Sequence, residues 1–465
     1  MSTPETPSGT KGGWTGRPAG IPAGVPPPSV PLSFLVAAAG GLVACGVAFV
    51  LARSVATIDP TDDRVVGAAH FAMLATLSMG VLGAIHQFTP VITQRPLRSV
   101  ALSRATFLSW LAGSWLLPIG FMSRHEVLVE LGGAFAALAV TVLVINVAAP
   151  LRARGKGAPT VGLRLAVIGF VVTACYGVVY VIDRRGKWFD LNGHVVLAHA
   201  SVGLLAWLGL TYLSVSEKLW PMFMLSHVPG RHRSGWIAIW SVFSGVALLS
   251  PGLLLAIPAL AIAGAAVVVT GLGAHLWSLS TYIRHRRRPV DLHVVFVVSS
   301  ALWLIIAVVL GVTSAVLVHL GESRGVAWTA ATVVALGGWL LVALVGHAHK
   351  IVPFIAWSAL RGRGVAKKSD GSQLMFADLF NHRWATVDYV LVNASVAALG
   401  AGFIFGDRAA LGIGGVLLVA TGLTTAANLA WRPVRLLKTG PVPSDQPPTP
   451  ISVAATLRDR APRSV

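Results

Sequence analysis

Charge is scarce in this sequence. Of its 465 residues, 11% are Asp, Glu, Lys or Arg, whereas 55% are hydrophobic and the mean hydropathy is +0.75. A soluble domain carries roughly 25% charged residues, so this chain has too little charge to cover a surface that faces water. The shortage excludes an ordinary soluble domain and indicates a membrane protein.

Cysteine is almost missing, and several metal and nucleotide motifs are missing altogether. The two cysteines, Cys45 and Cys175, both fall inside apolar runs, so neither a disulfide framework nor a thiolate metal site follows from them. No Cys-x-x-Cys or Cys-x-x-Cys-His occurs, which leaves a thiol copper relay and c-type haem attachment without support. The absence of a GxxxxGK[ST] phosphate loop argues against an ATP-driven pump.

Pro, Gly, Ser and Thr dominate both ends of the chain. Segments of this composition bury too little apolar surface to offset the entropy of ordering. We therefore predict disordered cytoplasmic tails over residues 1–30 and 436–465, with a single transmembrane domain over residues 31–435 between them.

Between the tails, apolar residues come in runs of about twenty, the length that crosses a ~30 Å hydrocarbon core. These runs predict an all-α membrane protein with about twelve transmembrane helices. Ser250-Pro251-Gly252 leaves almost no loop between the seventh and the eighth. The predicted spans are 32–53, 65–92, 103–121, 127–149, 161–182, 193–222, 235–250, 252–282, 292–318, 326–357, 387–406 and 409–431.

Basic residues indicate the orientation of these spans. Connections after even-numbered spans are rich in Arg and Lys; those after odd-numbered spans have fewer, with one local exception at Arg184, Arg185 and Lys187. The positive-inside rule then places both termini in the cytoplasm, in an integral protein of the bacterial inner membrane. The even connections carry Arg95, Arg98, Arg104, Arg152, Arg154, Lys156, Arg231, Arg233, Arg284, Arg286, Arg287, Arg288, Arg361, Arg363, Lys367 and Lys368.

The net charge of +19 follows from this topology and from contact with anionic lipid headgroups. The basic residues are spread over many short loops, which argues against nucleic acid as a partner. The lipid bilayer is the partner that the charge pattern predicts.

A long-period repeat relates three of the spans. The second, sixth and tenth spans end near Pro90, Pro221 and Pro353, which are 131 and 132 residues apart. In each span a polar residue stands four positions before the proline. The alternative explanation for these three prolines is that proline commonly ends helices. The even spacing over three four-helix blocks predicts three structurally related arcs of four helices.

One layer of histidines lies toward the external side. His70 begins the second span, and His194 and His199 begin the sixth. His194 and His199 are five residues apart, ~140° around a helix, so one should point into the bundle and the other elsewhere. Neutral imidazole is a ligand for haem iron or copper. These three residues are therefore candidate haem or copper ligands, with interhelical hydrogen bonding as the alternative role.

A second layer of histidines lies toward the cytoplasmic side. His347 and His349 lie on nearly opposite faces of one helix, which does not suit chelation of one ion. His86 is about 24 Å along the helix axis from His70, so no single metal takes both. The layer is a candidate second cofactor site; stabilisation of helix ends by cations is the alternative. Its members are His86, His275, His293, His347 and His349.

Acidic residues inside the predicted spans are few, and Glu130 and Glu217 are among them. Proton-coupled transporters usually need such groups. Glu217 and the adjacent Lys218, near a cytoplasmic end, are therefore the candidates for proton chemistry. An ion pair at the membrane boundary is the alternative role for these two residues.

The second span, from His70 to Pro90 (HFAMLATLSMGVLGAIHQFTP), resembles a helix of the haem-copper oxidase superfamily. In that helix, a haem-ligating histidine near the outer side is followed twenty residues later by proline. The sixth span, from His199 to Phe223, resembles the same pattern. The catalytic subunit of that superfamily has twelve helices in three arcs. The resemblance is greatest to its divergent oxidase-like members and to NnrS-type haem and copper proteins of nitric oxide response.

The sequence also departs from that superfamily. An oxygen-reducing member carries two adjacent histidines in the seventh span for a three-histidine copper site, whereas the seventh span here has no histidine. The tenth span has no histidine near its outer end, and the eighth has no lysine for a proton channel. A proton-pumping oxygen reductase is therefore not expected, and enzymatic activity stays undecided.

The leading hypothesis is an integral membrane protein that binds haem, copper or both, using His70 and His199. It would act in redox chemistry, nitric oxide response or metal homeostasis. One alternative is a transporter with a histidine-lined cavity. Another is a non-catalytic partner of a respiratory complex, and respiratory-chain or metal-handling membrane proteins are the partners that these hypotheses imply.

Overall fold

The computed structural model describes residues 26–152, 157–228, 233–368 and 371–431. Most of the two predicted tails, and the basic residues Arg154, Lys156 and Arg231, lie outside these ranges. The first helix begins at Ser29, within the segment predicted as the N-terminal tail.

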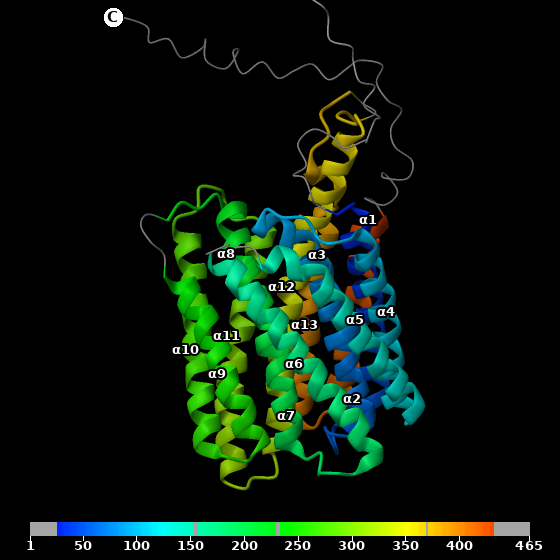
Figure 1. Ribbon diagram of the computed structural model, residues 1–465, viewed down its shortest axis with the longest axis vertical. Helices are drawn as coiled ribbons and strands as arrows, with labels where there is room; N and C mark the ends of the chain where they lie inside the picture. The colour runs from blue at the N-terminus through cyan, green and yellow to red at the C-terminus, as the bar shows by residue number, and fades with distance from the viewer. Residues whose placement is uncertain (1–25, 153–156, 229–232, 369–370, 432–465) are drawn as a thin grey trace, which may run out of the picture.

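The described residues form twelve helices that are long and apolar enough to cross a membrane, which confirms the predicted all-α membrane architecture (Figure 1). They are α1 (Ser29–Ala56), α2 (Asp63–His70) continued by η1 (Phe71–Ser78) and α3 (Met79–Thr93), α4 (Val100–Ser123), α5 (Glu126–Arg152), α6 (Ala158–Gly186), α7 (Gly193–Ser201) continued by η2 (Val202–Gly209) and α8 (Leu210–Met224), α9 (Ser234–Leu254), α10 (Pro258–Arg284), α11 (Leu292–His319), α12 (Gly325–Gly362), α13 (His382–Phe405) and α14 (Arg408–Thr425) continued by η4 (Ala426–Trp431).

Two boundaries differ from the predictions in an informative way. The seventh and eighth spans are separate helices, but Pro251 lies in the last turn of α9 rather than between them. The three residues that follow α9 make the turn, and Ala256 has a left-handed φ of 52°. The helix α12 runs five residues beyond the predicted end of the tenth span and projects past the other helices (Figure 1).

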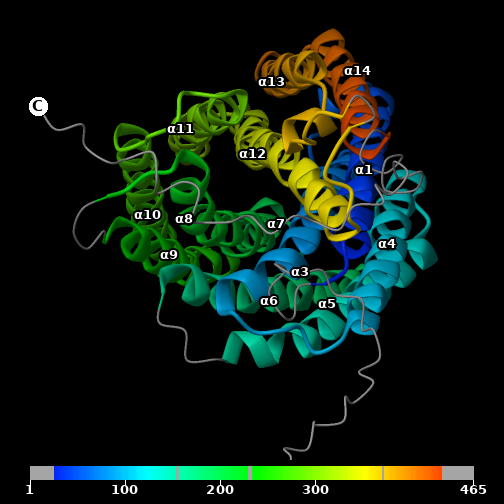
Figure 2. The same cartoon turned by 90° about the horizontal axis from the view of Figure 1, so that it is seen from above.

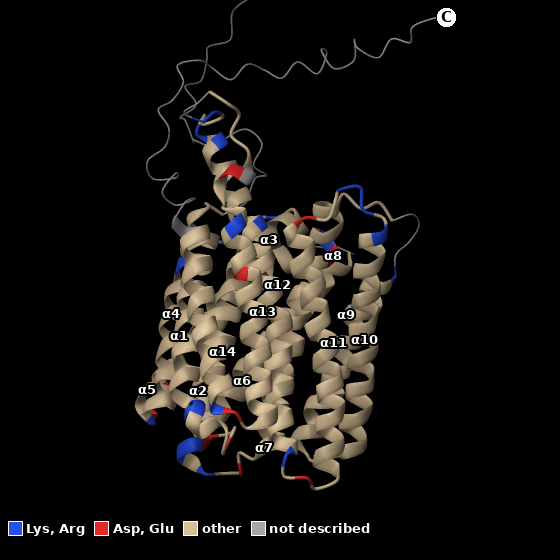
Figure 3. Cartoon of the chain, turned by 180° about the vertical axis from the view of Figure 1, so that it is seen from behind, with Lys and Arg blue, Asp and Glu red and all other residues tan. Residues whose placement is uncertain are grey.

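Charged residues gather at the two ends of the bundle, and the middle is nearly free of them (Figure 3). Large apolar side chains on the outside of the bundle are exposed, among them Leu108 at 63%, Ile262 at 69% and Val416 at 59%. So large an exposed apolar surface marks contact with lipid rather than water. The fold is therefore that of a polytopic membrane protein.

The end of the bundle that carries Arg98 and Arg287 is named the inner end, and the opposite end is named the outer end. At the outer end, acidic residues neutralise the arginines in the last turn of α6. Arg184 makes hydrogen-bonded ion pairs with Asp63 and Glu126, at 3.0 and 2.6 Å. The local exception to the basic-loop pattern is thus an ion-paired network.

Three spans are more buried than the others. In the spans Asp63–Thr93, Gly193–Met224 and Gly325–Gly362, 61% of the most apolar window is buried, against 50% or less elsewhere. Seen from above, α3, α7 and α12 lie inside a ring made by the other helices (Figure 2). These are the second, sixth and tenth spans, the three that end near the evenly spaced prolines.

Two of these central spans contain a π-helical segment at the same position. The segment η1 (Phe71–Ser78) and the segment η2 (Val202–Gly209) begin 131 residues apart, the same spacing as Pro90 and Pro221. A π segment widens the helix and is often found at functional sites. The repeat therefore extends from sequence to backbone geometry in these two spans, whereas α12 is α-helical throughout.

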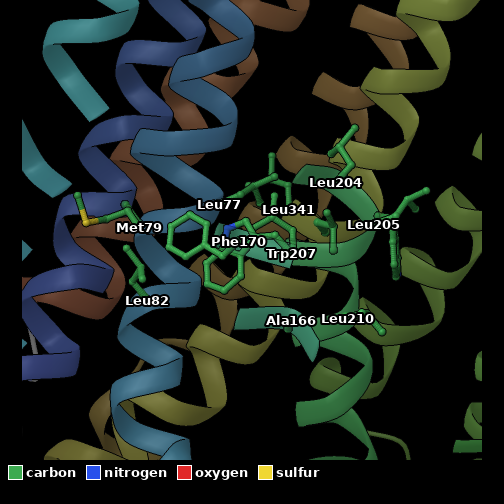
Figure 4. Close-up of a cluster of buried hydrophobic side chains, with 14 of the residues drawn as sticks. Leu77, Met79, Leu82, Ala166, Phe170, Leu204, Leu205, Trp207, Leu210 and Leu341 are labelled. Carbon is green, nitrogen blue, oxygen red and sulfur yellow. The ribbon is translucent and has the colours of Figure 1, made fainter. Parts of the chain in front are cut away.

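Aromatic side chains join the two π segments in the centre of the bundle (Figure 4). Phe170 stacks on Trp207 with ring centroids 3.8 Å apart and planes 7° from parallel. The indole N–H of Trp207 donates to the Ser78 hydroxyl at 3.0 Å. These contacts hold both π segments at the same depth in the bundle, between the outer and the inner layer of histidines.

Candidate functional site

His70 stands directly before η1 and has a fixed ring orientation. Its Nδ1 lies 2.8 Å from the Val66 carbonyl and must donate to it, because the carbonyl can only accept. In the neutral ring this leaves the lone pair on Nε2, the atom that can bind a metal. The ring also stacks on Phe121, with centroids 5.1 Å apart. His70 is thus oriented as a ligand would need to be.

His199 is the candidate ligand in the sixth span. Like His70, it stands just before the π segment of its central span. The ring of His199 lies beside Tyr180 and Tyr176, at centroid distances of 5.7 and 6.3 Å. Its Nδ1 is buried and has no hydrogen-bond partner among the described residues. Both histidines keep partial exposure although they lie inside the bundle.

His194 points elsewhere. Its Nδ1 donates to the Leu253 carbonyl at the end of α9, at 2.9 Å. The five-residue offset from His199 therefore separates the two rings, as the helical geometry predicts. Of the three outer candidates, His194 is bonded to α9, and His70 and His199 remain the candidate pair.

The inner histidines do not gather around one point, and their rings contact different neighbours. His86 is fully buried, stacks on Phe34 with centroids 5.2 Å apart, and donates from Nδ1 to the Leu82 carbonyl. The rings of His293 and His347 meet with centroids 4.7 Å apart. His275 lies against Trp220, at 4.8 Å.

His349 belongs to a buried ion pair that the sequence did not indicate. Its Nε2 lies 3.0 Å from Asp388 Oδ2, although the angle is too poor for a linear hydrogen bond. Its Nδ1 donates to the Val345 carbonyl. Thr424 donates to the other carboxylate oxygen. Asp388 stands at the start of the eleventh span, and its position there was the one available sequence signal.

Glu217 and Lys218 do not form a common site. The Tyr282 hydroxyl donates to Glu217 Oε2 at 2.9 Å, whereas Lys218, the next residue on the helix, is exposed. Neighbouring residues on a helix diverge by ~100°, which separates the two side chains. Tyr282 is therefore the described partner of Glu217, and sequence reasoning had not singled it out.

A small apolar cavity of about 80 Å³ lies where α1, α3, α8 and α12 meet. Tyr212, His347 and Gln87 supply polar groups to a lining that is otherwise mostly aliphatic. Drug-sized ligands and cofactors occupy pockets of ~300–1,000 Å³, so this cavity fits only a very small molecule. It lies between the central helices, in the inner half.

The described residues contain no group of three or more His, Cys, Asp or Glu side chains that could hold a metal ion. The pair His70–His199 is a different arrangement, with one imidazole from each of two central helices. Comparison with known proteins gives no identification, since the sequence matches no protein-family model and no curated protein. The geometry of the histidines is thus the main guide to function.

Proposed function

We propose that the protein is an integral membrane haem protein in which His70 and His199 would hold the haem. The observation that carries the proposal is the placement of these two imidazoles, each just before the π segment of a central span. Haem with two imidazole ligands serves electron transfer. A role in redox chemistry or nitric oxide response follows from that cofactor.

The residues present fit haem better than a multi-histidine copper site. His70 has the backbone acceptor that ligating histidines use to fix their tautomer, at 2.8 Å. The buried Nδ1 of His199 has no acceptor among the described residues, so its ring is less constrained. Copper enters the proposal only as another metal at the same two imidazoles, because the described residues supply no third ligand. Metal analysis distinguishes the two.

The family relationship is part of the same proposal. Three central spans, two of them with equivalent π segments, are compatible with three related four-helix arcs of the haem-copper oxidase type. An experimental structure would test this directly. If the three central spans did not occupy corresponding places in successive four-helix arcs, the relationship would be lost while a two-histidine haem site could remain.

A visible spectrum of the purified protein, with metal analysis, tests the cofactor. Haem gives a Soret band and α and β bands that change on reduction, with iron in proportion to protein. Copper without these bands would move the proposal to a copper site. A colourless and metal-free protein, purified from cells supplied with haem and copper, would refute both.

We further propose the N-in and C-in orientation in a bacterial inner membrane. The inner end carries the arginine-rich connections, whereas the outer-end cluster around Arg184 is paired with carboxylates. Reporter fusions placed after Arg98 and after Arg287 should both report cytoplasm. An external signal from either one contradicts the orientation.

The cavity near His347 supports a second candidate function. A transporter needs a central site between its helices, and the 80 Å³ cavity is the described space at that position. Its lining is mostly aliphatic, however, which does not suit an ionic cargo. Only a metal-free wild-type protein would make this the leading candidate, and uptake of small neutral solutes into proteoliposomes would then test it.

A further inference from the structure

Buried polar atoms without partners are concentrated in one part of the inner half. Trp220 Nε1, His275 Nδ1 and both ring nitrogens of His293 have no hydrogen-bond partner among the described residues. The three side chains are 0%, 2% and 5% exposed, respectively. Each buried polar group left without a partner destabilises the fold. Four such atoms in one cluster call for a ligand that they share.

The side chains of this cluster form a continuous row across α8, α10, α11 and α12. Successive ring centroids are separated by 4.8 Å from Trp220 to His275, 5.5 Å from His275 to Tyr212, 5.7 Å from Tyr212 to His347 and 4.7 Å from His347 to His293. The rings touch, yet no side chain of this row is joined to the next by a direct hydrogen bond among the described residues. Polar groups at such separations are commonly joined through water.

Each end of the row meets a distinctive feature. Trp220 contacts Tyr282, with ring centroids 6.4 Å apart, and Tyr282 is hydrogen-bonded to Glu217 near the inner end of the bundle. Toward the other end, Tyr212 and His347 line the cavity between the central helices, and His293 is the last ring of the row. The row therefore leads from a carboxylate near the inner end to the centre of the protein.

We propose that a chain of bound water molecules lies along this row, beside the polar edges of the rings. This chain would carry protons between Glu217 and the cavity at His347. Water both donates and accepts, so one molecule can satisfy an indole N–H and an imidazole nitrogen at once. A neutral imidazole accepts a proton at one nitrogen and releases one from the other. Each group along the chain thus takes up one proton and gives up another. A proton moves along the row, and no group gains or loses a proton overall. The inference does not depend on the haem site at His70 and His199.

Trp207 is a matched control for the bound water that we propose at Trp220. The indole N–H of Trp207 is as deeply buried as that of Trp220 but donates to Ser78. Hydrogen–deuterium exchange of the two indole groups can be followed by NMR in ¹⁵N-tryptophan-labelled full-length protein. We expect exchange at Trp220 to be roughly tenfold faster or more, which corresponds to about 1.4 kcal/mol less protection. Equal protection of the two would show that the row is dry and overturn the inference.

A second measurement tests the continuity of the row. The Nδ1–H groups of His347 and His86 make the same bond to the carbonyl four residues earlier, both at 2.8 Å, but His86 lies outside the row. The ring N–H of His347 should exchange faster than that of His86 by roughly tenfold or more. The variant His275→Phe should abolish that difference and leave His86 unchanged.

If His275→Phe fails to fold, the wild-type comparison of His347 with His86 still decides. An equal exchange rate in the wild type, or an undiminished difference in the folded variant, would overturn the proposed relay.

Discussion

The outer and inner parts of the central spans have opposite characters. Along α12, the stretch 326–337 is buried only at Ala331 and Ala335, whereas the stretch 338–349 is buried at every position but Leu344. The outer histidines His70 and His199 correspondingly keep partial exposure, whereas the five inner histidines are all buried. One protein thus presents histidine in an accessible layer and in a sealed one.

This difference indicates two uses of the same side chain. A histidine at an accessible position can receive a ligand that arrives after folding. A sealed histidine must be satisfied by what folds around it, as His349 is by Asp388, or by bound water. Burial alone therefore does not single out a cofactor ligand in this fold.

The sharpest test of the comparison substitutes histidines of the outer layer and, separately, histidines of the inner layer. In His70→Ala or His199→Ala, haem content should fall to nearly nothing because an axial ligand is lost, while membrane insertion is retained. In His86→Ala or His347→Ala, haem content per folded protein should stay unchanged. Pyridine haemochrome analysis of purified variants measures both. A full haem complement in His70→Ala would make His70 structural.

Breaking the buried ion pair should have the largest effect on stability. In Asp388→Ala, His349 loses its partner in a fully buried position, so the free energy of unfolding should fall by about 3–5 kcal/mol. The adjacent pair of Lys350 with Asp291 is its control, since Asp291 is 40% exposed. The Asp291 side chain also caps α11 by accepting from the Val294 N–H, so the control variant is Asp291→Asn, which removes the charge and keeps a capping oxygen and should cost about 1 kcal/mol or less.

Thermal unfolding in detergent, followed by circular dichroism, measures this contrast. Similar losses in the two variants would mean that burial does not set the importance of these pairs.

The ion-paired network at the outer end should have an intermediate effect. In Arg184→Met, Asp63 and Glu126 lose their charged donor while the apolar stem is kept, so the free energy of unfolding should fall by about 1–3 kcal/mol. Arg185→Met at the same end is the control, because Arg185 is 62% exposed. The same unfolding assay applies, and an Arg185 variant that loses more than the Arg184 variant would contradict the expectation.

The smallest effect concerns pH. Burial raises the pKa of Asp62, but hydrogen bonds from Arg64 and the charges of Arg64 and Arg124 outweigh it, and the pKa lies below its ordinary value. A carboxyl with a lowered folded-state pKa stabilises the fold at neutral pH. That contribution is lost as pH falls through the folded pKa.

The wild type should therefore lose more stability on acidification than Asp62→Asn, by about 1 kcal/mol or less. Unfolding midpoints measured from neutral pH down to pH ~3 would show it. Parallel curves for the two proteins would remove Asp62 from the acid response.

The sequence predicted the helices well because lipid imposes one simple rule, an apolar run long enough to cross the core. The depth of each histidine followed from its distance to the ends of these runs. The partners did not follow. The contact of His349 with Asp388 joins α12 to α13, and no periodicity within one span indicates which neighbour faces it. The row from Trp220 to His293 likewise draws on four helices.

The π segments were equally hidden, since nothing in Phe71–Ser78 or Val202–Gly209 breaks the apolar pattern. Their consequence is mechanical. Each wide turn sets the rotational phase of the outer part of its span relative to the inner part. Removing one residue there would turn the outer part by about 100° and swing His70 away from His199, while the proline-ended inner half stayed in register. The two ends of one continuous helix can therefore be aimed independently.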